Sequence, residues 1–211
     1  MMSFTEILNS FLNDVRNTGV LEIIAVFTGI LSVWYSRKEN ILVYPVGLVN
    51  TVLYIYLSLS QGLFGEASVN LYYTVMSIYG WMLWSRKDAH KISVLHITSS
   101  TKKEWMQQCM FFAAFFIAIF TALSFLKKGF YPNVIPWADA LASASAFTAM
   151  WLMTRKKIES WLWWITTNLA SIPLYFVKHY VLTSIYYFIL LGMAIWGWIE
   201  WEKRKQQQHA T

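Results

Sequence analysis

The chain has 211 residues, of which 57% are hydrophobic, 18% aromatic and only 13% charged. A soluble domain carries roughly 45–50% apolar and about 25% charged residues, so this composition is typical of a membrane protein and excludes a disordered chain. The formal net charge is +6. The single cysteine, Cys109, excludes an intrachain disulfide, and no Cys or His partner stands at metal-ligand spacing from it. We therefore expect neither a metal site nor a bound cofactor.

Seven segments are apolar enough to be transmembrane helices, which need about 20 mainly apolar residues. They are residues 21–36, 41–60, 67–84, 105–126, 134–153, 161–176 and 181–200. Before them, residues 1–20 place apolar side chains at helical spacing, which predicts an amphipathic helix at the membrane interface or an extension of the first span. The predicted fold class is an all-α, polytopic membrane protein with seven transmembrane helices, a loop at 85–104 and a tail at 202–211.

The basic residues divide unequally between the two sides of the predicted membrane protein. Thirteen of the 17 Lys and Arg fall on the side that holds the loop at 85–104 and the C-terminus, and four fall on the side of the N-terminus. Cytoplasmic loops carry an excess of Lys and Arg, so we expect an outside N-terminus and a cytoplasmic C-terminus. The positive charge thus orients the chain in a lipid bilayer and requires no nucleic-acid partner.

The two halves of the chain repeat each other at an offset of 117 residues. An aromatic-Gly-Trp-x-x-Trp motif at 79–84 recurs at 196–201, each time before a basic segment, and Trp34 corresponds to Trp151. A constant offset over three helices predicts two three-helix repeats. The predicted units are a first repeat at 21–84, a linker helix at 105–126 and a second repeat at 127–201, an arrangement of 3+1+3 helices. Because one helix joins them, the repeats enter the membrane in the same direction, and parallel-repeat transporters bind their cargo between the repeats.

Polar residues within spans indicate packing or function, because lipid cannot hydrogen-bond them. Asn50 and Asn168 lie 118 residues apart, which we interpret as equivalent positions after one inserted residue. Two facing amides could bind one small polar molecule, or they could join helices by hydrogen bonds worth about 0.6 kcal/mol on average. Trp164 shares a helix face with Asn168, four residues later. An indole that stacks on a cation and an amide that binds a carboxamide suit a flat, cationic, amide-bearing ring.

A second group of polar residues follows the third helix of each repeat. Asn70 and Tyr73 recur at helical spacing before Gly80, and the offset of 117 places Tyr187 opposite Asn70. These residues either line a cavity or belong to a packed interface in which Gly80 and its counterpart allow helices to approach closely. Two acids, Glu22 and Asp139, stand near the starts of their helices, where the helix dipole favours them.

Several enzyme motifs are missing from the sequence. It contains no phosphate-binding P-loop, no zinc-hydrolase motif and no nucleophile elbow, so we expect no enzyme and no catalytic residues. No Lys or Arg falls in the middle of a predicted span, and a phosphorylated cargo normally needs one in its pocket. A small neutral or cationic cargo without phosphate fits best. The alternatives are a membrane enzyme with a polar cluster at one depth, and a structural or sensor subunit that binds nothing.

Three features of the sequence point to a known family: the repeat, the two glycine motifs, and Trp164-x-x-x-Asn168 followed by Ile172-Pro173-Leu174-Tyr175. In these features the chain resembles the PnuC-type vitamin transporters along nearly its whole length. The resemblance implies uptake of nicotinamide riboside, a precursor of NAD, by facilitated diffusion across the inner membrane. It also implies substrate contacts from Trp164 and Asn168, and a homotrimer. Where that family often has Asp and then Gln four residues later, this chain has Glu66 and Asn70. Thiamine or another vitamin is the alternative cargo.

Overall fold

The computed structural model describes residues 19–60, 64–87, 93–127 and 135–210, together with residues 5, 8–9 and 11–12. Its helices are α2 (Val20–Arg37), α3 (Val43–Ser60), α4 (Phe64–Trp84), α5 (Lys102–Lys127), α6 (Pro136–Thr154), α7 (Glu159–Val177) and α8 (Val181–Ala210). Each predicted span corresponds to one of these helices, with ends that differ by at most three residues except at the end of α8. The amphipathic helix expected over 1–20 lies almost wholly outside the described residues.

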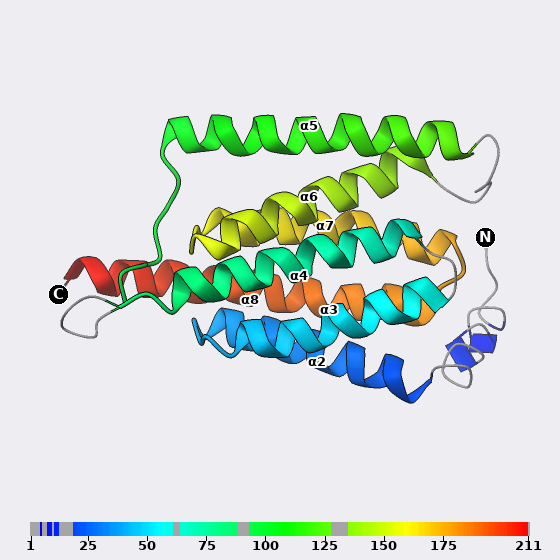
Figure 1. Ribbon diagram of the computed structural model, residues 1–211, viewed down its shortest axis with the longest axis horizontal. Helices are drawn as coiled ribbons and strands as arrows, with labels where there is room; N and C mark the ends of the chain where they lie inside the picture. Colours follow the sequence, from blue (N-terminus) through cyan, green and yellow to red (C-terminus); the bar gives the residue numbers. More distant parts are fainter. Residues whose placement is uncertain are drawn as a thin grey trace.

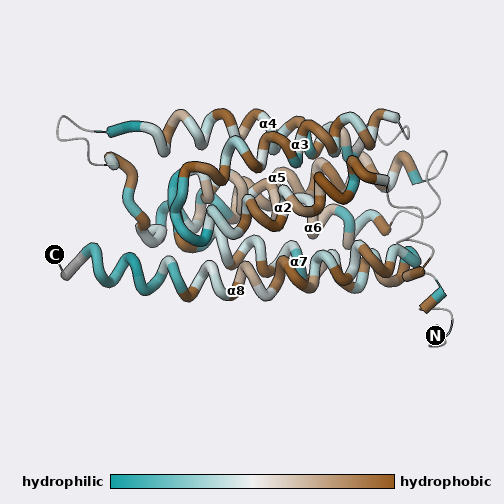
Figure 2. Tube along the Cα trace, turned by 90° about the horizontal axis from the view of Figure 1, so that it is seen from below, coloured by the Kyte–Doolittle hydropathy of each residue, from teal (hydrophilic) through white to brown (hydrophobic). Residues whose placement is uncertain are grey.

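Helix α8 continues through the segment that was expected to be a tail. It has 30 residues and reaches Ala210. Ion pairs between side chains one turn apart support this extension: Glu200 with Arg204 at 3.0 Å and Glu202 with Lys205 at 3.4 Å. A helix of this length measures roughly 45 Å, more than the ~30 Å hydrocarbon core of a bilayer, and its last turns are hydrophilic (Figure 2). The end of α8 therefore stands in water.

The described helices run side by side as one bundle (Figure 1). Four of them, α2, α3, α5 and α8, are long and apolar enough by composition to cross a membrane. The other three, α4, α6 and α7, have 21, 19 and 19 residues and lie among them. Helix α6 buries many small or hydroxyl side chains against its neighbours, including Ala140, Ala144, Ser145, Thr148 and Ala149. Side chains that face other helices instead of lipid need not be strongly hydrophobic.

Six helices close into a ring, and α5 lies outside it. The neighbours around the ring are α2, α3, α4, α6, α7 and α8, and α8 packs on α2 again. Within the described helices, α5 packs mainly along α6 (Figure 1), and its side chains also reach α7, where Trp163 bonds Gln108, and α4, where Tyr72 meets Phe115. Helices α3 and α7 therefore occupy opposite places in the ring. This order supports two three-helix units, α2–α4 and α6–α8, whose interior is enclosed by all six helices.

Two contacts at one end of the bundle join residues that are 117 positions apart. The Ser36 hydroxyl donates to Met153 Sδ at 3.0 Å, and Lys156 Nζ donates to Glu39 Oε1 at 2.6 Å. Equivalent residues of two repeats can meet only where the axis that relates the repeats passes between them. We call this end of the bundle, where Ser36, Glu39, Met153 and Lys156 lie, the axis end.

The same end contains a matched pair of indole hydrogen bonds. Trp84 Nε1 donates to the Thr154 carbonyl at 3.2 Å. Trp201 Nε1 is shared between the Arg37 carbonyl at 3.2 Å and the Ser36 carbonyl at 3.1 Å. Thr154 and Arg37 are the last residues of α6 and α2, whose final carbonyls lack partners within their own helices. Each repeat therefore caps a helix of the other repeat with a tryptophan.

The glycines of the repeated motif allow this packing. A Cβ at Gly197 would lie 2.6 Å from three ring atoms of Trp161, and a Cβ at Gly80 would overlap the Tyr44 ring. Tyr44 and Trp161 are also 117 residues apart, and both are almost fully buried. The expectation that these glycines let helices approach closely is supported at both positions.

Residues 93–101, the end of the segment expected to be a polar loop, lie against the axis end. Ile97 is buried in the same core cluster as Trp84 and Trp161. Ser100 donates to both carboxylate oxygens of Glu159, at 2.8 Å through its N–H and 2.7 Å through its hydroxyl. At the start of α5, bonds to Lys157 and to the Thr101 N–H lower the pKa of the Glu104 carboxyl to about 2.

The matched caps predict matched effects on stability. We expect Trp84→Phe and Trp201→Phe each to destabilise the detergent-solubilised protein by about 1–3 kcal/mol, because each leaves a buried carbonyl without its donor. Thermal unfolding in one detergent measures both. Trp198→Phe, on an exposed part of α8, is the control and should unfold like the wild type. A loss in one cap variant with none in the other would contradict the equivalence of the two caps.

Candidate functional site

Three tryptophans that are close in sequence on α7 have three different surroundings. Trp161 belongs to the buried core of the axis end. Trp163 Nε1 donates to the side-chain oxygen of Gln108 on α5 at 2.7 Å. Trp164 packs against the edge of that core and also meets Tyr73 of α4, with 6.3 Å between the ring centroids. Because α4 and α7 are not neighbours in the ring, Trp164 and Tyr73 meet in its interior.

Asn168 lies one turn after Trp164 and is 3% exposed. Within the described part of the chain, its side-chain amide makes no hydrogen bond, whereas the neighbouring Thr167 hydroxyl donates to the Trp163 carbonyl at 2.9 Å. Most buried polar groups in folded proteins have a partner, so an unpartnered amide requires an explanation. A ligand that supplies the missing partners is such an explanation.

Tyrosines from α7 and α8 complete this group. The Tyr187 ring stacks on Tyr175 at 5.2 Å with an interplanar angle of 15°, and its hydroxyl also interacts with Ser171. The Tyr186 ring meets the Tyr187 ring, with 5.7 Å between their centroids. Four of the six residues predicted from the sequence are therefore connected through α7: Trp164 and Asn168 lie on this helix, Tyr73 meets Trp164, and Tyr187 meets Tyr175 and Ser171.

Asn50 has a structural partner and is not the equivalent of Asn168. Its Nδ2 donates to the Ala25 carbonyl of α2 at 2.6 Å. Helices α3 and α7 are both uninterrupted, so the offset of 117 that relates Tyr44 to Trp161 continues along them and pairs Thr51 with Asn168. The expected offset of 118 is therefore wrong, since neither helix holds an inserted residue. Neighbouring positions of a helix differ by about 100° in direction, so the two amides are presented differently.

Asn70, the sixth predicted residue, is bonded to its own helix. Its Nδ2 donates to the Glu66 carbonyl, four residues earlier, at 3.0 Å, and the Thr74 hydroxyl donates to its carbonyl at 2.9 Å. None of its contacts among the described residues joins it to Trp164 or Asn168. The structure therefore does not bring Asn70 into the group.

Sequence reasoning missed four residues around this group: Tyr72, Phe147, Gly29 and Tyr186. The Phe147 ring lies edge-on to Tyr73 at 6.2 Å, and its carbonyl accepts from the Tyr72 hydroxyl at 2.9 Å. Gly29 lies against Asn50 and against the Tyr186 hydroxyl. The sequence offered one indication of Gly29, a glycine in the middle of a predicted span. Nothing in the sequence distinguishes Phe147 from the other phenylalanines.

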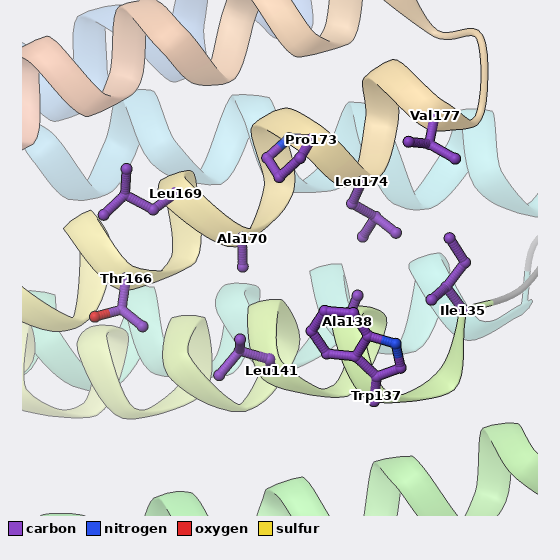
Figure 3. Close-up of a pocket in the computed structure, with 10 residues that line it drawn as sticks. All are labelled: Ile135, Trp137, Ala138, Leu141, Thr166, Leu169, Ala170, Pro173, Leu174 and Val177. Atoms are coloured by element: carbon purple, nitrogen blue, oxygen red, sulfur yellow. The ribbon is translucent and has the colours of Figure 1, made fainter. Parts of the chain in front are cut away.

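A groove of about 440 Å³ lies between α6 and α7, away from this group (Figure 3). It is lined by Ile135, Trp137, Ala138, Leu141, Thr166, Leu169, Ala170, Pro173, Leu174 and Val177. Its walls are almost wholly apolar, and Trp137, Leu169 and Val177 are well exposed. The hydroxyl of Thr166 already donates to the Leu162 carbonyl at 3.0 Å. The groove suits lipid better than a polar cargo, so the candidate site is the interior group.

Two cations near the ends of the bundle have partners. Lys178 pairs with Asp139 at 2.7 Å, and Asp139 also accepts from the Ile135 N–H at the start of α6, as expected for an acid at a helix N-terminus. At the axis end, the Arg37 guanidinium lies 3.7 Å from the Trp196 ring centroid. No Lys or Arg among the described residues belongs to the interior group, so this group offers no cation to a phosphate.

A family model described as nicotinamide mononucleotide transporter matches residues 19–203. The chain belongs to this family. It is 23% identical to the nicotinamide riboside transporter PnuC of Escherichia coli over 201 aligned residues, which cover 86% of this chain and 84% of that protein. It is 25% identical over 185 residues to the riboflavin/roseoflavin transporter RibM of Streptomyces davaonensis, covering 85% of this chain and 83% of the relative.

The fold of the family is shared as well. A crystal structure of the vitamin B3 transporter PnuC matches with a TM-score of 0.69 at 22% identity, over 98% of this chain and 94% of that chain. The relatives are transporters and not enzymes. Together with the apolar helices, membership of the family makes this protein a multi-pass membrane transporter.

The different partners of the two asparagines predict different effects on stability. Asn168→Leu should keep or raise the melting temperature of the ligand-free protein in detergent, because the amide that it removes makes no hydrogen bond among the described residues. Asn50→Leu should lower it, because it removes the donor to Ala25. Equal losses in both variants would indicate that Asn168 has a structural partner and would weaken its assignment to a ligand site.

Proposed function

We propose that this protein carries nicotinamide riboside across the inner membrane into the cytoplasm. The observation that supports this most directly is the unpartnered Asn168 amide one turn from Trp164, in the interior of the ring. Nicotinamide riboside is a flat cationic ring with a carboxamide. The Trp164 indole would attract and stack on the ring, and the Asn168 amide would exchange two hydrogen bonds with the carboxamide.

The remaining interior residues have supporting roles in this proposal. Tyr73 and Tyr187 would line the site, with hydroxyls that can bond the ribose. Asn50 and Asn70 were expected to contact the substrate as well, but their present bonds to Ala25 and Glu66 make them supports of the helices around the site. A riboside is favoured over the mononucleotide in the family's description, because a phosphate normally needs Arg or Lys in its pocket.

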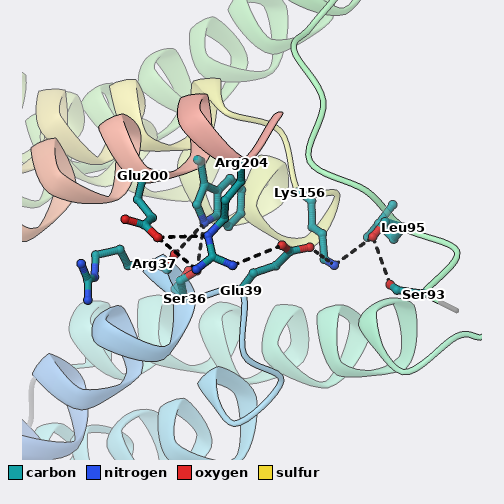
Figure 4. A network of polar contacts seen from close by, with 9 residues as sticks. Ser36, Arg37, Glu39, Ser93, Leu95, Lys156, Glu200 and Arg204 are labelled. Carbon is teal, nitrogen blue, oxygen red and sulfur yellow. Dashed lines mark hydrogen bonds and ion pairs between the residues drawn. The ribbon is translucent and has the colours of Figure 1, made fainter. Parts of the chain in front are cut away.

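The proposed transport mechanism is alternating access by facilitated diffusion. Two similar units around one axis can rock against each other and open the site to each side in turn. At the axis end the units are joined by a network in which Lys156 binds Glu39 and the Leu95 carbonyl, and Arg204 lies 3.9 Å from Glu39 (Figure 4). We assign the axis end to the cytoplasm, so the described state is closed on that side.

The resemblance to PnuC-type transporters also supports a homotrimer. Helix α5 contacts the ring along one side only, and Met106, Met110 and Ile117 on it are exposed. Cross-linking through Cys109, which is exposed on the same helix, tests for association of copies in native membranes.

Uptake into proteoliposomes tests the substrate. We expect labelled nicotinamide riboside to enter the proteoliposomes. Asn168→Ala and Trp164→Ala should reduce this uptake at least tenfold, because they weaken substrate binding. Thr166→Ala, on the same helix, should leave the uptake unchanged. An excess of unlabelled nicotinamide riboside should compete, while its mononucleotide, thiamine and riboflavin should not. Competition by riboflavin or thiamine alone would assign the protein to that vitamin instead.

Single cysteines test the orientation. In a Cys109→Ser background, we expect Tyr180→Cys to react with a membrane-impermeant maleimide in intact cells, because Tyr180 is exposed in the α7–α8 loop at the end opposite the axis end. Lys87→Cys, in the loop after α4, should react only after the cells are permeabilised. The reverse pattern would place the axis end outside and overturn the proposed direction.

A further inference from the structure

Gly29 leaves room for two polar side chains against the backbone of α2. A Cβ at this position would lie 2.6 Å from the Tyr186 hydroxyl and 2.9 Å from Asn50 Nδ2. Both distances are shorter than ordinary contacts of a Cβ atom, so a side chain here would displace at least one of these groups. The amide of Asn50 is held in place by its bond to the Ala25 carbonyl, one turn earlier on α2. Tyr186 is therefore the group with more freedom to move.

This arrangement occurs in one repeat only. At the offset of 117, Gly29 corresponds to Ala146, Asn50 to Thr167 and Tyr186 to Val69. Conversely, Trp164 and Asn168 correspond to Gly47 and Thr51 in the first repeat. The interior thus combines a symmetric set of helices with two different linings. One lining holds an amide and a phenol against α2, and the other holds an indole and an unpartnered amide on α7.

We propose that Gly29 is a positioning and specificity residue, which sets the width of the substrate site by letting the Tyr186 hydroxyl withdraw against α2. The inference rests on the proposed transport of nicotinamide riboside. The Tyr186 ring meets that of Tyr187 on the same helix, with 5.7 Å between the centroids, and Tyr187 and the pair of Tyr73 and Trp164 belong to the interior group. A methyl group at position 29 would therefore push Tyr186 toward the space in which the substrate ring stacks, and would exclude the substrate by size.

Binding of nicotinamide riboside to the purified full-length protein tests the inference. We expect Gly29→Ala to weaken binding at least tenfold. Gly192→Ala is the matched control, because a Cβ at Gly192 on α8 would meet nothing within 4 Å, and it should bind as the wild type does. Removing the displaced hydroxyl should relieve the effect, so Gly29→Ala should cost much less affinity in a Tyr186→Phe background than alone.

The outcomes separate this inference from the proposed function. If the wild type does not bind nicotinamide riboside, the proposed function fails. If the wild type binds and Gly29→Ala binds equally well, the role of Gly29 is wrong. An equal loss with and without the Tyr186 hydroxyl would also overturn it, because general damage to packing would not depend on that oxygen. If Gly29→Ala alone does not fold, the double variant Gly29→Ala, Tyr186→Phe is decisive: it should fold and bind nicotinamide riboside nearly as tightly as Tyr186→Phe does, and a loss of at least tenfold relative to Tyr186→Phe, or failure to fold, would overturn the inference.

Discussion

The capping of each repeat by a tryptophan of the other is the interaction on which the rest of the architecture depends. The last carbonyls of α2 and α6 have no partners within their helices, and both lie where water is excluded by buried aromatic rings. Trp201 and Trp84 supply the missing donors across the axis. Neither three-helix unit satisfies these groups alone, so the units are stable as a pair, and the pairing fixes the closed ring of six helices.

This joint at one end has consequences for the middle of the bundle. The glycines at 80 and 197 bring the helices close at the axis end, where large rings fill the space. Farther along the helices, polar and aromatic side chains such as Tyr73, Trp164 and Asn168 meet in the interior. Motion that opened the axis end would have to break the two caps and the bond between Lys156 and Glu39 together. An all-or-none opening of this kind is what a transporter needs to avoid a leak.

Much of this fold follows from local sequence patterns, because lipid imposes simple rules on length and polarity. Hydropathy located α2 to α8, and the glycine motifs indicated the two repeats. The pair Trp164 and Asn168 was recognisable because two chemically matched residues share one helix face. Gly29 was not, because its importance depends on Asn50 and Tyr186, which come from two other helices. Asn50 and Asn168 share a residue type but not a position in the repeat, because α3 and α7 are continuous helices that keep the offset of 117 residues.

A symmetric frame with an asymmetric lining also accounts for the spread of cargo among relatives. The caps, the glycines and the axis pair involve residues at equivalent positions, and they maintain the two units whatever is bound between them. Interior positions of the two repeats carry different residues: Trp164 corresponds to Gly47, and Gly29 corresponds to Ala146. Changes there alter the shape of the site without disturbing the joint. A relative named as a riboflavin/roseoflavin transporter is 25% identical to this chain. Our proposal that interior side chains select the cargo would explain how different cargo and a shared fold coexist.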